Sequence, residues 1–175
     1  ILGFSKRKYH LNRRFFQNID SEEKAYWLGF IYADGYIVQS NDGTGSEVSI
    51  ELMESDHGHL EKFNMSLEGN LIVDKKVLKD RFIKGNFVKG GKLSSVIRIY
   101  SSDMARDLIS HDVLQNKTYL PNFPKVKDEL FLHFLRGFFD GDGTLSYSKG
   151  ILSVAFTNAN MEFLKYIKEV RKQSL

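Results

Sequence analysis

The fold is decided by WLGFIYADG at residues 27–35, a pattern that returns as LRGFFDGDG at residues 135–143. A shift of 108 residues aligns the small residues, the acid and the final glycine of the two stretches. Apolar residues recur at helical spacing in both, and a closing glycine is typical of a helix C-terminus. A match at so long a period indicates two pseudo-symmetric halves rather than a solenoid.

The residues around the first stretch predict one complete unit. Asp20, followed by Glu23, is expected to cap the first helix. Alternating apolar and polar side chains over 48–53 predict a strand with one wet face. In order, the expected elements are a helix at 20–34, strands at 36–39 and 48–53, a helix at 56–67, hairpin arms near 81–88 and 94–100, and a short helix near 102–110.

The second stretch begins a shorter copy of this unit. Its expected elements are a helix at 127–141, a strand after Gly143, a turn at Lys149-Gly150, a strand at 151–157 and a helix from about Asn160. The predicted fold is α+β, with two pseudo-symmetric αββαββα repeats whose motif helices pack at the centre, the second repeat being incomplete. The predicted divisions are a basic segment at 1–19, the first repeat at 20–118, a connector at 119–126 and the partial second repeat at 127–175.

Composition excludes several classes of protein. The chain has 175 residues, of which 42% are hydrophobic, and this is enough apolar material for one packed domain or two small ones. It has no cysteine, which excludes a disulfide scaffold, a thiolate zinc site and a cysteine nucleophile. No apolar run approaches the ~18 residues of a membrane span, and no secretory leader is visible. We therefore expect an intracellular protein that is neither secreted nor bound to membrane.

Charge is unevenly distributed although the net charge is only +3. Residues 1–16 carry five basic residues and no acid, and residues 75–98 carry eight basic residues against Asp80 alone. Such segregation resembles the electrostatic footprint of a nucleic-acid-binding protein. Solvated loops and hairpin edges give the same pattern, so charge alone leaves both interpretations open.

Small residues in the two stretches predict a close helix contact. Gly29 and Ala33 are four residues apart and therefore share a helix face, as do Gly137 and Gly141. Small side chains at this spacing let two helix backbones approach closely. We expect these four residues to form the interface between the motif helices.

That contact would place Asp34 beside Asp142, each at the C-terminal end of its helix. A carboxylate there faces the negative end of the helix dipole, and two adjacent carboxylates repel each other. A divalent cation removes both penalties, and oxygen ligands with open water positions suit Mg²⁺. Paired carboxylates holding such ions are what phosphodiester hydrolysis needs.

With both stretches and their downstream strands in view, the chain resembles a double-motif, single-chain LAGLIDADG homing endonuclease over residues 20–175. The resemblance implies a site-specific endonuclease acting on double-stranded DNA, not on a small molecule. It implies that Asp34 and Asp142 are catalytic and bind Mg²⁺ or Mn²⁺. It also suggests Lys117, in Asn116-Lys117-Thr118, as a catalytic residue, although an exposed loop lysine is an equally good interpretation. The family fold places an antiparallel β saddle in the DNA major groove.

The outward positions of the predicted strands then become candidate DNA contacts. Val48, Ile50 and Leu52 should pack on the helices, as should Leu152, Val154 and Phe156 in the second copy. The candidate DNA-binding residues are Tyr36, Val38, Ser40, Ser49, Glu51, Met53, Arg81, Lys84, Arg98, Tyr100, Ser146, Ser148, Ser153 and Thr157. Arg98 could bond guanine or phosphate.

Two short motifs and one related function are alternatives to this interpretation. DGDGTL at 140–145 matches the nucleophile motif of haloacid-dehalogenase-type phosphatases, but only 31 residues follow Thr144. The same string fails as an EF-hand loop, because Leu145 and Ile151 stand where Gly and Glu are required. A non-cleaving relative such as an intron maturase stays open.

The incomplete second repeat carries an expectation of its own. Its sheet should keep an unpaired edge and an exposed apolar patch. We therefore expect the chain to bind DNA mainly through residues 36–100, and either to cleave poorly or to self-associate.

Overall fold

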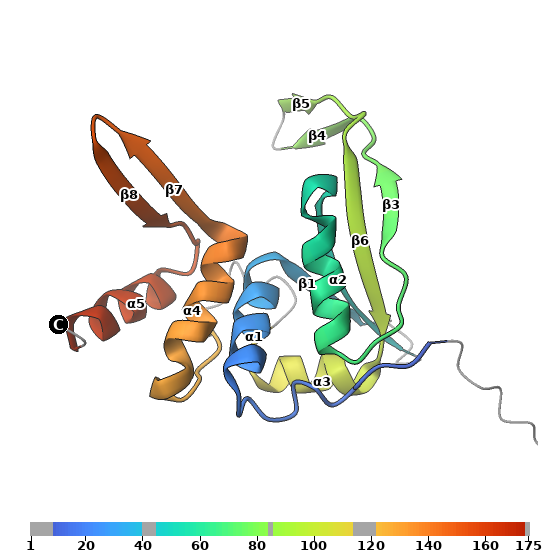
Figure 1. The fold of residues 1–175 in the computed structure, drawn as a ribbon, viewed down its shortest axis with the longest axis horizontal. Coiled ribbons are helices and arrows are strands. Elements are labelled where there is room, and N and C mark those ends of the chain that lie inside the picture. Colours follow the sequence, from blue (N-terminus) through green and yellow to red (C-terminus); the bar gives the residue numbers. More distant parts are fainter. Residues whose placement is uncertain (1–8, 40–44, 84–85, 114–121, 174–175) are drawn as a thin grey trace, which may run out of the picture.

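The computed structural model describes residues 9–39, 45–83, 86–113 and 122–173, in which helices and antiparallel strands form an α+β fold (Figure 1). The elements are α1 (Glu22–Asp34), β1 (Gly35–Gln39), β2 (Ser46–Met53), the 3₁₀ helix η1 (Glu54–Asp56), α2 (His57–Ser66), β3 (Asp74–Val77), β4 (Arg81–Ile83), β5 (Asn86–Val88), β6 (Leu93–Tyr100), α3 (Ser102–Ser110), α4 (Asp128–Asp142), β7 (Gly143–Ser148), β8 (Ile151–Phe156) and α5 (Met161–Gln173).

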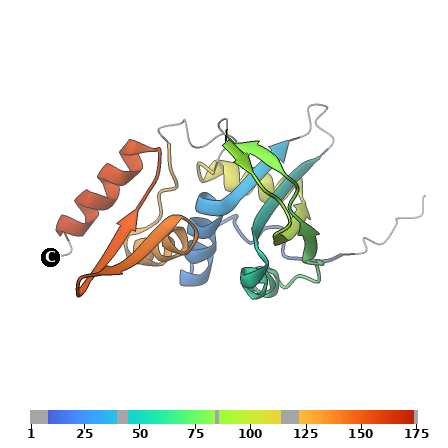
Figure 2. The ribbon, with the colours of Figure 1, turned by 90° about the horizontal axis from the view of Figure 1, so that it is seen from above.

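The centre of the molecule is the pair α1 and α4, which stand side by side between the two halves (Figures 1 and 2). A Cβ at Gly29 would collide with the carbonyl oxygen of Phe134, and one at Gly137 would collide with that of Tyr26. Two helix backbones therefore touch with no side chain between them. Gly141 faces Ala33 one turn further on, so the helices run in the same direction and end together.

The start of α1 differs from the sequence prediction. Ser21, not Asp20, is the N-cap, and its hydroxyl accepts a hydrogen bond of 3.3 Å from the Lys24 amide. An N-cap side chain must reach the second or third helical N–H, and Asp20 lies one residue too far out. The Asp20 carboxylate instead binds the Lys24 ammonium at 2.8 Å.

One four-stranded sheet, in the order β1-β2-β6-β3, forms the first half. The prediction of hairpin arms at 81–88 and 94–100 is wrong, because β6 pairs with β3, while β4 and β5 pair with each other. The sequence of β3 is DKKV, which is almost entirely polar and carries no apolar alternation. A charged strand of this kind suits a sheet edge, where it discourages further pairing.

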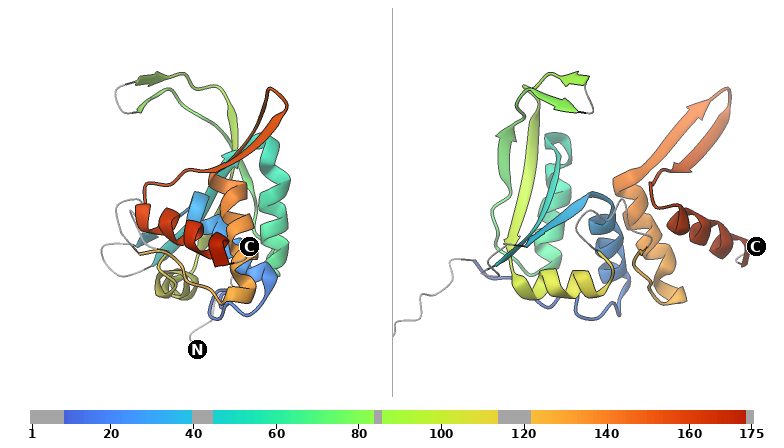
Figure 3. Two further views of the ribbon diagram at one scale, coloured as in Figure 1. Left: turned by 90° about the vertical axis from the view of Figure 1, so that its left-hand side faces the viewer. Right: turned by 180° about the vertical axis from the view of Figure 1, so that it is seen from behind.

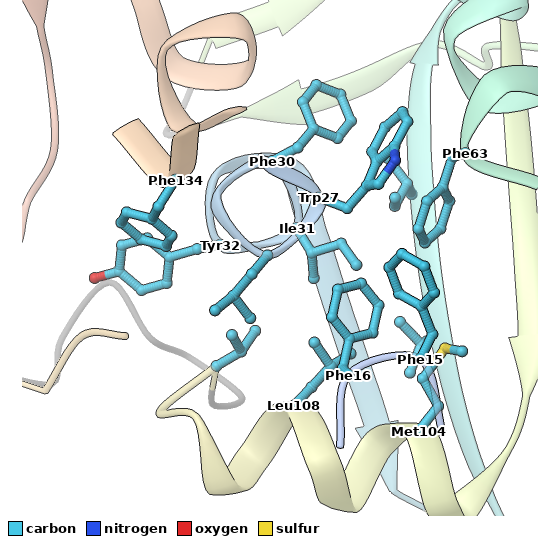
Figure 4. Packing of buried hydrophobic residues seen from close by; sticks show 14 of the residues in the cluster. Phe15, Phe16, Trp27, Phe30, Ile31, Tyr32, Phe63, Met104, Leu108 and Phe134 are labelled. Atoms are coloured by element: carbon cyan, nitrogen blue, oxygen red, sulfur yellow. The ribbon is translucent and has the colours of Figure 1, made fainter. Parts of the chain in front are cut away.

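The core lies under the inner face of this sheet. Val48, Ile50, Ile97 and Ile99 are fully buried there, which agrees with the predicted alternation. Figure 4 looks along α1 and shows Trp27 with Phe63 of α2 on one side, and Tyr32 with Phe134 of α4 on the other. The Trp27 indole N–H also donates to Ser66 at 2.8 Å, which ties α1 to α2.

The second half is the two-stranded sheet β7–β8, followed by α5. Its turn uses positive φ at Lys149 and Gly150, as tight hairpin turns require. The prediction that Leu152 and Val154 pack on helices is wrong, since these side chains are 62% and 57% exposed.

The position of α5 explains why that face of β7–β8 is uncovered. Leu145 and Tyr147 share the face with Leu152 and Val154 and are also exposed. Only Phe156, at the base of the hairpin, packs on Phe138 and Phe139. α5 instead buries Phe163 against α4 and α1, away from the hairpin (Figure 3).

Candidate functional site

Asp34 and Asp142 stand at the adjoining ends of α1 and α4, and both are half-buried. Gly141 makes their approach possible, because a Cβ there would lie 3.0 Å from Oδ2 of Asp34. The charge of Asp142 is also felt by a neighbouring phenol. Burial raises the pKa of Tyr32 to about 12, and the charges of Asp112 and Asp142 act in the same direction.

Neither helix offers compensation within its last turn, which contains no basic residue in α1 or in α4. Both carboxylates therefore face the negative ends of two parallel dipoles. Across the described residues, no group of three or more His, Cys, Asp or Glu side chains is arranged to hold a metal ion. A pair of oxygen donors fits Mg²⁺, which keeps several waters and is often bound by one or two carboxylates plus substrate phosphates.

The outer face of the four-stranded sheet carries half of the predicted DNA-contacting residues. Tyr36, Val38, Met53 and Tyr100 are all exposed there. Ser49 is different, because it is fully buried between its cross-strand partners Tyr36 and Arg98. Its hydroxyl donates to Glu47 at 2.9 Å, so the prediction of an outward, accessible Ser49 is corrected.

Charges on this face are paired across the strands. Arg98 lies between Glu47, at 3.7 Å, and Asp74, at 3.5 Å. Lys76 pairs with Glu51 at 2.7 Å, and Ser94 donates to the same glutamate. Sequence reasoning missed Glu47, although its alternation with Ser49 places it on this face. It could not find Asp74 or Lys76, because the strand that carries them was not predicted.

The β4–β5 hairpin stands apart from the sheet (Figure 1) and carries an exposed aromatic pair. The rings of Phe82 and Phe87 contact edge to face at 5.4 Å, and the two residues are 75% and 58% exposed. Lys79, Lys89 and Lys92 flank them in the sequence.

Several predicted residues lie outside the described residues. They are Ser40, Lys84 and Lys117, together with the side chain of Arg81. In the second half, Ser146 and Ser153 are cross-strand partners and exposed. Ser148 and Thr157 are exposed as well, the latter just after β8.

Part of the basic N-terminal segment is used within the molecule. Arg13 donates to the carbonyl of Tyr100 at 3.0 Å, and Arg14 pairs with the buried Asp107 at 3.0 Å. A cavity of about 520 Å³ opens where this segment meets the outer face, lined in part by Tyr9, Arg13 and Arg98. No helix in the described ranges is long and apolar enough to span a bilayer.

Comparison with known proteins gives one family match. Residues 129–172, from α4 to α5, match the model of the LAGLIDADG-like domain. No curated protein matches the chain.

Two solved structures illustrate the similarity. The homing endonuclease I-WcaI bound to its DNA recognition sequence is 13% identical, with 87% of this chain and 80% of that chain covered and a TM-score of 0.43. The LAGLIDADG meganuclease I-AabMI bound to uncleaved DNA is 16% identical, with 82% and 71% covered and a TM-score of 0.40. The region from α4 to α5 is thus similar to a LAGLIDADG-like domain, as the family model matches it.

Proposed function

We propose that the chain is a site-specific double-strand DNA endonuclease of the homing type, which hydrolyses phosphodiester bonds with Mg²⁺ or Mn²⁺ held by Asp34 and Asp142. The observation that carries this proposal is the joint ending of two related helices. α1 and α4 touch through glycines, run in parallel, and bring the Asp34 carboxylate against Gly141, next to Asp142. We also propose that the chain acts inside the cell, where its DNA substrate lies.

In the proposed reaction, Asp34 and Asp142 would only have to hold a divalent ion. A bound divalent ion would polarise the phosphodiester and lower the pKa of a bound water. Asp34 and Asp142 would hold that ion, and the negative ends of both helix dipoles would add to its attraction. The close backbone contact at Gly29 and Gly137 brings the two helices, and with them the ends that carry the carboxylates, close together.

DNA would lie on the outer face of the four-stranded sheet. Exposed Tyr36, Val38 and Tyr100 offer apolar contact to bases, for example to thymine methyl groups. Arg98 and Lys76, and the lysines around β4–β5, offer donors to base edges and phosphates. Lys117 stays a candidate catalytic residue by sequence alone.

The direct test is cleavage of a plasmid library that carries a randomised insert, incubated with the chain and Mg²⁺. Sequencing of the cut ends should show one preferred site, and EDTA should abolish cutting. Absence of any metal-dependent cut in a library that the chain measurably binds would contradict the proposal.

A second candidate function is non-cleaving nucleic-acid binding, as in an intron maturase. The exposed aromatic and charged residues of the four-stranded sheet and of β4–β5 favour it, because binding through them does not require Asp34 or Asp142. Self-association through the uncovered face of β7–β8 is a related proposal. Binding of the library without cleavage would support the non-cleaving function. The mass of the chain in solution would show whether it self-associates.

A further inference from the structure

A polar cluster lies on the opposite side of the last turn of α4 from Asp142. The Tyr26 hydroxyl donates to Oδ2 of Asp140 at 2.7 Å and lies 3.1 Å from Nε2 of His59. These three side chains come from α1, α4 and α2. Residues two apart in a helix point in directions about 200° apart, so Asp140 is directed away from Asp142.

The surroundings of Tyr26 and His59 shift the pKa of both side chains. Burial raises the pKa of Tyr26, and its hydrogen bond to Asp140 raises it further, so the phenol remains a donor. Burial lowers the pKa of His59, which packs on Phe30 at 4.5 Å between ring centroids. A neutral imidazole with its proton on Nε2 can donate to Tyr26 while Tyr26 donates to Asp140. The Arg136 guanidinium covers the Tyr26 ring at 4.9 Å.

The internal repeat supplies a natural comparison. The shift of 108 residues carries Tyr26 onto Phe134 and Tyr32 onto Asp140. With the shorter turn of the second copy, His59 corresponds to Phe163, and both pack on equivalent phenylalanines of the helix pair.

The equivalent cluster is built from aromatic rings. Tyr32 contacts Phe134 at 6.2 Å and Phe163 at 5.2 Å between centroids. The Tyr32 hydroxyl accepts a long hydrogen bond of 3.4 Å from Asn160. One side of the helix pair is therefore held by apolar packing, and the other by a short hydrogen bond to a carboxylate.

We propose that Tyr26 and Asp140 are positioning residues that fix the last turn of α4 against α1, and with it the spacing of Asp34 and Asp142. Glycine contacts bring the helices close but leave few side chains to stop one helix from sliding or rotating on the other. A charge-assisted hydrogen bond is directional and roughly twice as strong as a neutral one, so it can set that register. The catalytic consequence rests on the proposed function, whereas the structural tie does not.

The first test measures amide hydrogen exchange in residues 139–143 of the metal-free chain. Tyr26→Phe and Asp140→Ala should accelerate exchange roughly tenfold, because each removes the hydrogen bond. Asp140→Asn keeps an acceptor oxygen but loses the charge, so its exchange rate should lie between those of the wild type and of Asp140→Ala. Tyr32→Phe is the control, because it removes a tyrosine hydroxyl of α1 in the symmetry-related cluster, at the position equivalent to Asp140, and it should leave exchange in 139–143 unchanged.

The second test measures cleavage of the duplex that the wild-type chain selects from the randomised library. Tyr26→Phe should slow cleavage at saturating DNA roughly tenfold, while the Kd for DNA stays within about twofold of the wild-type value. Asp140→Asn should cleave faster than Asp140→Ala, because it keeps an acceptor for the Tyr26 hydroxyl. Equal behaviour of Tyr26→Phe and Tyr32→Phe in both tests would overturn the tie. A wild-type chain that cuts no duplex would overturn the proposed function, while hydrogen exchange would still decide on the tie.

Discussion

Asp34 and Asp142 each occupy a place that is costly for a carboxylate, at the negative end of a helix and beside another acid. Proteins usually keep a residue in an unfavourable place of this kind when the residue has a function there. At the scale of single residues, these two side chains would serve as metal ligands and would take no part in binding the DNA backbone.

Changing Asp142 to Asn should therefore separate cleavage from binding. The variant keeps the shape of the side chain but removes the charge that attracts a divalent ion, and cleavage should fall by roughly a hundredfold or more. Its Kd for DNA should change by less than about twofold. Asp128→Asn, at the exposed opposite end of the same helix, is the control. Undiminished cleavage by Asp142→Asn would remove Asp142 from the site.

His59 should give the stability of the chain a measurable pH dependence. Burial lowers the folded-state pKa of His59 below 6.5, and the charge of Lys62 lowers it further. The charges of Asp140 and Asp56 act in the opposite direction but are outweighed. As the pH falls below about 6.5, the unfolded chain takes up a proton that the folded chain does not. The free energy of unfolding should therefore fall in this range and level off below the folded-state pKa.

Urea denaturation between pH 5 and 8 checks this expectation. His59→Phe copies the residue that the second repeat has at Phe163 and removes the titrating group. Its unfolding free energy should vary less steeply over that range. An unchanged pH profile in the variant would show that another group carries the effect.

At the scale of elements, the helix pair depends on the absence of two side chains. Gly29 and Gly137 each sit against the backbone of the other helix, where a methyl group meets a carbonyl oxygen that cannot rotate away. Interlocking of this kind sets the distance between helices more strictly than packing of flexible side chains does.

Gly137→Ala should consequently destabilise the chain although alanine is the better helix former. Forcing the helices apart should cost about 1–3 kcal/mol or more in unfolding free energy. Gly58→Ala is the matched control, since Gly58 lies in α2 with nothing near its missing Cβ. That variant should gain about 0.5–1 kcal/mol. Equal effects in denaturant titrations would mean that the helices do not touch at Gly137.

At the scale of the whole molecule, the two halves differ in how their sheets are covered. The inner face of β1-β2-β6-β3 buries Val48, Ile50, Ile97 and Ile99 completely. The corresponding face of β7–β8 leaves Leu145, Tyr147, Leu152 and Val154 open. A contiguous apolar patch of this kind promotes association in solution.

Leu152→Thr should lower the tendency to associate without unfolding the chain. Because Leu152 is 62% exposed, the change in unfolding free energy should stay within about ±0.5 kcal/mol. Ile97→Thr, at a fully buried position of the other sheet, should cost at least about 1 kcal/mol. Light scattering against concentration measures the association, and no difference between the wild type and Leu152→Thr would exclude this face as its cause.

The sequence alone predicted the elements that depend on residues close together in the chain. The repeated stretches predicted α1, α4 and their junctions with β1 and β7, and alternation predicted β2, β6 and the buried isoleucines. These predictions succeed because the backbone itself sets the periods of helices and strands. They also succeed because a glycine at a helix contact stands where an ordinary helix would carry a larger side chain.

What only the tertiary structure decided are pairings between distant residues. The polar β3 pairs with β6 because the edge of the sheet is open to it, and its own sequence has no apolar alternation that would predict this pairing. Leu152 and Val154 alternate as their first-copy equivalents do, yet stay exposed because α5 packs elsewhere. The bond between Tyr26 and Asp140 joins positions that nothing local relates. The sequence determined which elements form, since those depend on near neighbours. Tertiary packing decided which of them meet, because a polar side chain has no preferred partner until the fold brings one within reach.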